Sequence, residues 1–276
     1  MIDPALFLNA LLHVLPVLYG VAFFNYVLLF LTEERLVLRL ARPLLTVSVL
    51  TNVAYVLAYT IHHHHIPLVN VFQVMGAVGL ATAATYLVVE SRTKTPFTGP
   101  FILLPVVVCQ VVHTFFLPGS GKVPEILFDP LFGVHVTAAV LGYSAFVVAA
   151  AYGFLYLALY HDIRRKKFGL IFRRLPSLDI LDRMNAAAAT VGLVCLTVAI
   201  AAGLIWSRER FGSVQMDPKV IAAMATWLIY GVAVLGRPFS VTGARTAYTT
   251  LAGFVVMLFS LFGVNFFFTH FHRFGG

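Results

Sequence analysis

Two histidines stand where long apolar segments meet polar sequence, and their imidazoles could bind a metal ion. His135 lies near the start of one such segment, and His272 lies four residues before the end of the chain. A haem iron held between two imidazoles needs their nitrogens about 4 Å apart, because each metal–nitrogen bond is roughly 2 Å long. The pair is therefore a candidate set of haem ligands. The alternative is that each imidazole hydrogen-bonds to water or to the backbone.

The segments that carry these histidines are predicted to be membrane-spanning helices. Of 276 residues, 60% are hydrophobic and 11% are charged, against roughly 25% charged in a soluble domain. Apolar segments long enough to cross a bilayer as helices fall at about 5–31, 37–61, 67–89, 99–117, 130–160, 184–205, 218–236 and 246–269. We expect an all-α integral membrane protein, a bundle of about eight transmembrane helices in which residues 1–276 form a single membrane domain. This composition excludes nucleic-acid enzymes and secreted scaffolds.

Lysine and arginine are distributed unevenly between the connections. Fourteen of them follow the first, third, fifth and seventh spans, and five lie on the opposite side. Because cytoplasmic connections carry the excess of Lys and Arg, we expect both termini to be extracytoplasmic. The protein is then a multi-pass protein of the inner, or cytoplasmic, cell membrane. Nine of the ten histidines fall in the outer half, and His161 is the exception.

The longest cytoplasmic connection, from His161 to Arg183, mixes basic residues with apolar residues such as Phe168 and Phe172. This mixture favours a segment that lies in the headgroup layer over anionic lipid. The alternative is a docking site for a cytoplasmic partner protein.

The other histidines give weaker indications. His62 to His65 are consecutive, and adjacent residues in a loop cannot all point at one ion. Opportunistic binding of nickel or zinc is therefore favoured over a dedicated metal site. We expect His13, His113 and His161 to be interfacial or bundle-facing residues with a local hydrogen bond.

The segment from Gly203 to Arg237 resembles the tryptophan-rich signature of the cytochrome c assembly family, the CcsA, CcmC and HemX-like haem-handling membrane proteins. The positions that follow this signature are Trp206, Gly212, Asp217, Pro218, Lys219, Trp227, Leu228, Tyr230 and Arg237. Three further segments resemble family stretches: His65-Ile-Pro-Leu-Val-Asn70, His135-Val with Gly142-Tyr143, and Gly263-Val-Asn265 followed by His272. The resemblance covers about residues 62–276 in the family's order.

The resemblance implies roles for individual residues. It implies that His135 and His272 ligate haem iron above the membrane, and that the segment from Trp206 to Asp217 forms a platform beneath the macrocycle. The cofactor-binding residues that it implies are Trp206, Phe211, Asp217, Pro218, Trp227, Asn265, His65 and Asn70. Aromatic faces suit a flat macrocycle. Its propionates suit cations, for which the candidates are Arg208, Arg210, Lys219 and Arg273.

The chain also departs from the family pattern. Where typical members carry two or three tryptophans before the Asp, this chain has Phe211, Val214 and Met216, so residues 203–219 resemble a degenerate haem-handling loop. Gly236 ends the stretch in which family synthases tend to have a membrane-embedded histidine. These departures point to the HemX-like and YpjD-like branch, some of whose members are linked to control of haem synthesis.

We therefore expect a haem-binding or haem-sensing protein that handles haem at the extracytoplasmic face or regulates haem synthesis, and that is not an enzyme. The expected cofactor is haem b, in substoichiometric amounts. The expected partners are the lipid bilayer, haem and a membrane or cytoplasmic protein, without nucleic acid. Two alternatives stay open. One is a b-type membrane electron-carrier subunit, which would need paired mid-span histidines that the sequence lacks, and the other is a cofactor-free transporter or accessory subunit.

Overall fold

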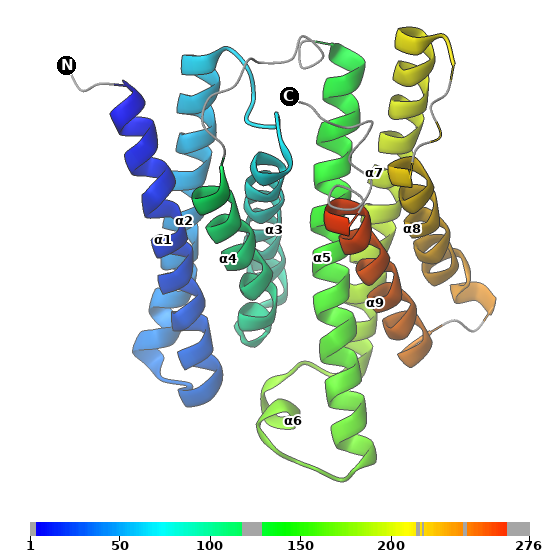
Figure 1. Ribbon diagram of the computed structural model, residues 1–276. Helices are drawn as coiled ribbons and strands as arrows, with labels where there is room; N and C mark the ends of the chain where they lie inside the picture. Colours follow the sequence, from blue (N-terminus) through cyan, green and yellow to red (C-terminus); the bar gives the residue numbers. More distant parts are fainter. Residues whose placement is uncertain (1–3, 118–128, 214–215, 217, 240–241, 264–276) are drawn as a thin grey trace. The chain divides into compact units, whose positions relative to one another are not determined.

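The structure is a computed structural model of the 276-residue chain, and it describes residues 4–117, 129–213, 216, 218–239 and 242–263 (Figure 1). Within these residues every regular element is helical, and eight helices are long and apolar enough to cross a membrane. The prediction of an all-α, multi-pass membrane protein is confirmed.

The chain divides into two compact units. Unit 1 comprises residues 1–120 together with 173–175, and unit 2 comprises residues 121–172 and 176–276. That all the spans form a single membrane domain stays a prediction.

Unit 1 is built from four long helices: α1 (Pro4–Thr32), α2 (Arg35–His63), α3 (Val71–Thr93) and α4 (Gly99–Phe116) (Figure 1). α1 packs against α2 and α4, and α3 packs against α4. Only two residues separate α1 from α2, and Glu33 makes this sharp turn with a positive φ of 58°. Arg174, from the long basic connection, pairs with Glu33 and lies 5.7 Å from the centre of the Phe97 ring.

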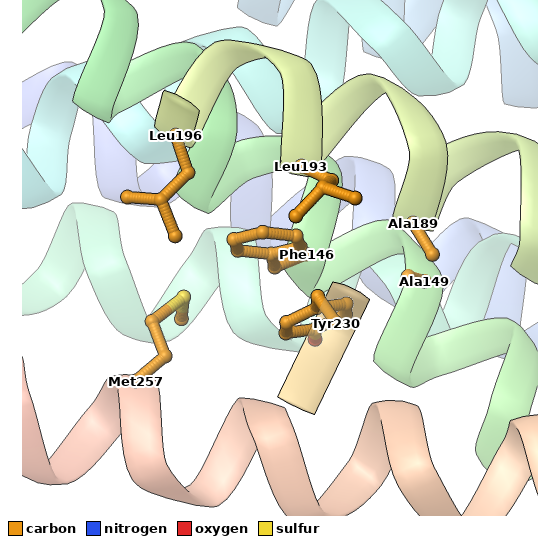
Figure 2. Close-up of a cluster of buried hydrophobic side chains, with 7 residues drawn as sticks. All are labelled: Phe146, Ala149, Ala189, Leu193, Leu196, Tyr230 and Met257. Carbon is orange, nitrogen blue, oxygen red and sulfur yellow. The ribbon is translucent and has the colours of Figure 1, made fainter. Parts of the chain in front are cut away.

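Unit 2 contains α5 (Pro130–Arg164), α7 (Leu178–Phe211), α8 (Pro218–Leu235) and α9 (Ala244–Leu258). α5 packs along α7 and also against α9, while α8 packs against α7 and α9. Figure 2 shows the buried core where these helices meet, in which the rings of Phe146 and Tyr230 are stacked with their centroids 3.7 Å apart.

The connection between α5 and α7 contains the five-residue helix α6 (Leu170–Arg174), whose last two residues belong to unit 1. Phe168 and Phe172 pack edge to face at 4.9 Å, and their side chains are 57% and 41% exposed. Exposed aromatic rings among basic side chains suit a lipid headgroup layer. The lipid or partner contact of this connection stays a prediction.

Several helix boundaries differ from the predicted ones. α3 begins at Val71, later than the predicted residue 67, because Asn70 caps it by accepting a hydrogen bond from Gln73 N at 3.0 Å. α7 extends several residues beyond the predicted span at both ends, where charged residues continue the helix. α9 is followed by a π-helix at Phe259–Gly263, and the rest of the predicted last span lies outside the described residues.

Candidate functional site

The candidate site begins at the N-terminus of α5, which Asp129 and Pro130 define. The Oδ1 atom of Asp129 accepts hydrogen bonds from the backbone N–H groups of Leu131 at 2.9 Å and Phe132 at 3.4 Å. Pro130 occupies the first helical position, where its missing N–H leaves no hydrogen bond unmade. This capped first turn fixes the position of His135 one turn later.

His135 is partly buried and makes a specific hydrogen bond to α7. Its Nδ1 atom lies 2.7 Å from the carbonyl oxygen of Ala199. Because a carbonyl only accepts, Nδ1 carries the proton and donates it. Nε2 of the neutral ring is then the unprotonated nitrogen, which is the form that binds a metal ion.

Gly203 makes room for this imidazole on α7. A Cβ atom built at Gly203 would lie 2.7 Å from Nδ1 and 2.9 Å from Cε1 of His135. Both distances are shorter than a side chain tolerates, so the ring lies directly against the helix backbone. Gly203 follows Ala199 by one helical turn, and the two residues therefore form one continuous small-residue face toward α5.

A row of aromatic rings connects His135 to the end of α7. The Phe132 ring lies 6.2 Å from the His135 ring and 5.5 Å from the Trp206 ring, and Trp206 meets Phe211 edge to face at 5.7 Å. Asp129 holds this row in place, since its Oδ2 atom accepts a hydrogen bond from the indole Nε1 of Trp206 at 3.0 Å. Phe211, at the exposed end of the row, is 54% exposed.

The other predicted platform residues have different surroundings. Trp227 donates from Nε1 to Oγ1 of Thr197 at 2.8 Å and packs against the buried core cluster of unit 2. Pro218 is exposed at the start of α8. Arg208 and Arg210 are exposed in the last turn of α7, and Lys219 is partly exposed in the first turn of α8.

Several predicted site residues lie outside the described residues: Asp217, Asn265, His272 and Arg273. The facing pair of His135 and His272 therefore stays a prediction.

His65 and Asn70 belong to unit 1 and form part of the ordered turn between α2 and α3. His65 is 7% exposed, and its Nδ1 atom donates to the carbonyl of Ile66 at 3.0 Å. Asn70 is the N-cap of α3, and Gln73 accepts a hydrogen bond from Val69 N at 2.7 Å. The visible contacts of Asn70 are those of a helix cap, and its proposed role toward a cofactor stays a prediction.

The consecutive histidines form ring contacts. His63 lies 4.7 Å from His62 and 5.9 Å from His65, measured between ring centroids. Among the residues that the structure describes, no group of three or more His, Cys, Asp or Glu side chains is arranged to hold a metal ion.

The expectation of a local hydrogen bond is correct for two of the three remaining histidines. Nδ1 of His13 lies 2.8 Å from the Asn9 carbonyl, and Nδ1 of His161 lies 2.7 Å from the Leu157 carbonyl. His113 is bundle-facing as expected, but the expected local hydrogen bond is not found among the described residues. The residue is 3% exposed, and neither ring nitrogen has a hydrogen-bond partner within the described part of the chain.

A shallow open groove of about 450 Å³ runs along another face of α5. Its lining residues recur at helical spacing: Pro130, Gly133, Val134, Thr137, Ala138 and Leu141. His135 and Phe132 point away from this face toward α7, so the groove is separate from the site around His135.

Sequence reasoning missed four residues of this site: Asp129, Phe132, Ala199 and Gly203. Asp129-Pro130 is a recognisable helix start, and Gly203 inside a helix is an unusual residue that indicates close packing. The pairing of Asp129 with Trp206 spans 77 positions of the chain. No spacing rule along one helix predicts such a contact.

Comparison with known proteins gives the relationship of the whole chain. The family model described as Cytochrome C assembly protein matches residues 11–272. The chain is 28% identical over 235 residues to the cytochrome c biogenesis protein CcsA of Guillardia theta, covering 76% of this chain and 77% of that protein. It is 27% identical over 224 residues to protein HemX of Brevibacillus brevis, with 78% and 80% covered, and 24% identical over 250 residues to HemX of Bacillus subtilis (strain 168), with 89% and 91% covered. The family-model match spans α5 and α7, which carry His135 and Trp206, and the chain belongs to the cytochrome c assembly protein family.

Proposed function

We propose that the chain binds haem at the extracytoplasmic end of unit 2, with His135 and His272 as the two axial ligands. It handles haem there or regulates haem synthesis, and it does not act as an enzyme. The observation that carries this proposal is the hydrogen bond from His135 Nδ1 to the Ala199 carbonyl, which leaves Nε2 as the ligating atom. Membership of the cytochrome c assembly family supports it.

The residues around His135 fit a haem group. Phe132 and Trp206 provide aromatic faces for a flat apolar macrocycle, and the Asp129 carboxylate holds the Trp206 indole. The exposed cations Arg208 and Arg210 suit the propionates. When bound, haem b would supply an iron that the imidazoles of His135 and His272 would ligate.

Each group in this chain then has a defined task. The Ala199 carbonyl and the bare backbone at Gly203 orient the His135 ring, and the row from Phe132 to Phe211 excludes water from the ring's surroundings. Asp217, Pro218, Trp227 and Asn265 complete the proposed cofactor-binding set of unit 2, whereas the proposed cofactor role of His65 and Asn70 in unit 1 rests on the family resemblance alone.

The chain is proposed to belong with the HemX-like members rather than with full synthases. HemX proteins are among its relatives, with similar coverage to the CcsA proteins. Phe211 and Met216 occupy positions where typical members carry tryptophan, and fewer large aromatic faces mean weaker binding. Substoichiometric haem b in the purified protein is the expected consequence.

Redox difference spectra of the protein purified in detergent test this proposal. A handling protein contains substoichiometric haem that added haemin completes, an electron carrier contains stoichiometric haem, and a transporter subunit takes up none. Haemin is then titrated into His135→Ala and His272→Ala, with His161→Ala as the matched control because His161 lies at the opposite end of α5. The proposal requires loss of the Soret shift in the first two variants and wild-type binding in the third. Equal titration of all four proteins would refute it.

A further inference from the structure

The interior of unit 1 contains polar side chains at every depth of a membrane-spanning bundle. Side chains less than 9% exposed on its four long helices include Tyr19, Tyr26, Ser48, Asn52, Tyr55, Gln73, Thr82, Tyr86, Glu90, Gln110 and His113. They come from α1, α2, α3 and α4, each of which is long and apolar enough to cross a membrane. Polar groups inside a bilayer are costly, and they usually mark paths for ions or protons.

His113 is the most unusual of these residues. Its ring packs so closely on Gly76 that a Cβ atom there would lie 2.2 Å from Nδ1, and it meets the edge of the Tyr55 ring at 5.8 Å. Neither of its nitrogens hydrogen-bonds to any residue that the structure describes. If these polar side chains served packing alone, each buried polar atom would have a hydrogen-bond partner, because an unpaired buried nitrogen costs stability.

A chain of rings leads from His113 to one end of the unit. The Tyr55 ring lies 6.0 Å from the Tyr59 ring, and Tyr59 lies 4.3 Å from the exposed ring of His63. The Tyr59 hydroxyl accepts a hydrogen bond from Gln73 Nε2 at 3.0 Å. His63 ends α2 on the side that the charge distribution predicts to be extracytoplasmic.

A second set of contacts leads from His113 toward the middle of the bundle. Gln110 lies one turn before His113 on α4, and its Oε1 atom accepts from Asn52 Nδ2 at 3.3 Å. The same amide nitrogen lies 3.3 Å from the Tyr19 hydroxyl, to which it also donates. Tyr19 is near the centre of α1, about 20 Å from either end at 1.5 Å per residue. Gln110 Nε2 has no partner among the described residues.

The half of unit 1 toward the Glu90 end of α3 also contains buried polar side chains. Thr82 is 1% exposed, and its hydroxyl has no partner in the described ranges. Tyr86 follows Thr82 by one turn on α3, and its ring lies 5.8 Å from that of Tyr26. The Tyr26 hydroxyl donates a hydrogen bond to Glu90, which lies three residues before the end of α3.

We propose that the interior of unit 1 holds bound water and carries protons across the membrane, with His113 and Glu90 as the proton-exchanging groups. Water fills polar sites whose atoms lack protein partners, and His113, Gln110 and Thr82 have such atoms when the described residues alone are considered. His113 accepts a proton on one ring nitrogen from the His63 side and releases the proton of the other nitrogen toward Gln110. The Glu90 carboxylate accepts a proton from the path and returns it to water at the α3 end. The net step moves one proton down its electrochemical gradient, and no bond between heavy atoms changes.

Proton flux into proteoliposomes tests this proposal. Purified full-length protein is reconstituted into vesicles that contain pyranine and potassium, and valinomycin then sets an inside-negative potential. Wild-type vesicles should acidify faster than protein-free vesicles. His113→Gln and Glu90→Gln should each abolish the protein-dependent part of the rate, because glutamine keeps the polarity but does not titrate.

His13→Gln is the matched control. His13 lies on α1 in the same unit and is exposed; its Nδ1 atom lies 2.8 Å from the Asn9 carbonyl, and its ring meets the exposed Phe115 ring edge to face at 6.4 Å. It should conduct like the wild type. Flux is compared only for variants whose gel-filtration profile matches that of the wild type. The two path variants, His113→Gln and Glu90→Gln, change opposite ends of the bundle, so misfolding of one of them does not decide the result. A protonophore added to protein-free vesicles checks that the assay detects proton entry. If the vesicles respond to it and the wild-type flux still equals the flux of protein-free vesicles, the proposal is overturned. Equal flux in the wild type, both path variants and the control would overturn it too.

Discussion

Changing Gly203 to alanine tests the placement of His135 without touching the ligand itself. The new Cβ atom would lie 2.7 Å from Nδ1 and 2.9 Å from Cε1 of His135, so the imidazole must move away from α7. This movement breaks the 2.7 Å hydrogen bond to the Ala199 carbonyl. The ring then loses the hydrogen bond that fixes both its orientation and its tautomer.

The magnitude follows from three opposing contributions. Overpacking costs about 1–3 kcal/mol, and the lost hydrogen bond costs about 0.5–1.5 kcal/mol. The higher helix propensity of alanine returns about 1 kcal/mol. We expect Gly203→Ala to lower the free energy of unfolding by roughly 0.5–3.5 kcal/mol. Loss of an outer partner of a metal-ligating histidine typically weakens binding about 10–100-fold, and we expect the Kd for haem to rise by that factor.

Gly231→Ala provides the control. Gly231 is also a helical glycine of unit 2, and although it is more buried than Gly203, a Cβ atom there would meet nothing within 4 Å. Haemin titration followed by the Soret band gives the Kd of each variant, and thermal unfolding in the same detergent gives its stability. If Gly203→Ala bound haem as tightly as Gly231→Ala, the proposed role of the His135 orientation would be wrong.

Four further predictions concern the site, the fold and the topology. Asp129→Ala removes a helix cap worth about 0.5–2 kcal/mol and the hydrogen-bond acceptor of the Trp206 indole. In a Trp227→Phe background, Trp206 is the one remaining tryptophan of two. In that background, Asp129→Ala should shift the Trp206 fluorescence emission to the red and reduce its quenching by haem. Asp182→Ala removes the acceptor of two hydrogen bonds from Arg237, at 3.3 and 2.8 Å, and of one from Gly243 N at 3.1 Å. It should lower the free energy of unfolding by about 1–3 kcal/mol, a cost intermediate between those of breaking an exposed and a buried ion pair. The control Asp179→Ala, at an exposed position, should lower it by less than about 1 kcal/mol. Restoring tryptophan at Val214 and Met216 should tighten haem binding roughly five- to 150-fold, at about 0.5–1.5 kcal/mol for each aromatic face, whereas unchanged titration would identify the loop as a partner-docking surface. Reporter fusions at Gly276 and within residues 166–175 should report the extracytoplasmic and cytoplasmic sides respectively, and a cytoplasmic signal at Gly276 would contradict the charge-based topology.

The number and type of the helices could be predicted because long apolar segments have few alternatives in a membrane. Their ends could not be predicted as well. Asn70 moves the start of α3 by accepting a hydrogen bond from Gln73, and charged turns extend α7 beyond its apolar segment. Local capping and solvent-exposed helical turns determine these boundaries, and hydrophobicity does not report them.

The position of His135 could be predicted from its place at the start of α5, but its surroundings could not. Phe132 and Trp206 come together through the packing of α5 on α7, and Gly203 allows the close approach. His113 shows the same limit, because a local hydrogen bond was expected and its ring instead packs between Gly76 and Tyr55. Contacts between helices that are distant in sequence determine both environments.

Electron paramagnetic resonance of the haem-loaded ferric protein tests the central claim most directly, because it reports the number and type of axial ligands. We predict a low-spin, six-coordinate signal in the wild type and in the His161→Gly control. His135→Gly and His272→Gly should each lose this signal, and added imidazole should restore it by filling the vacated position. A wild-type low-spin signal that persists unchanged in both variants would contradict ligation of haem by His135 and His272.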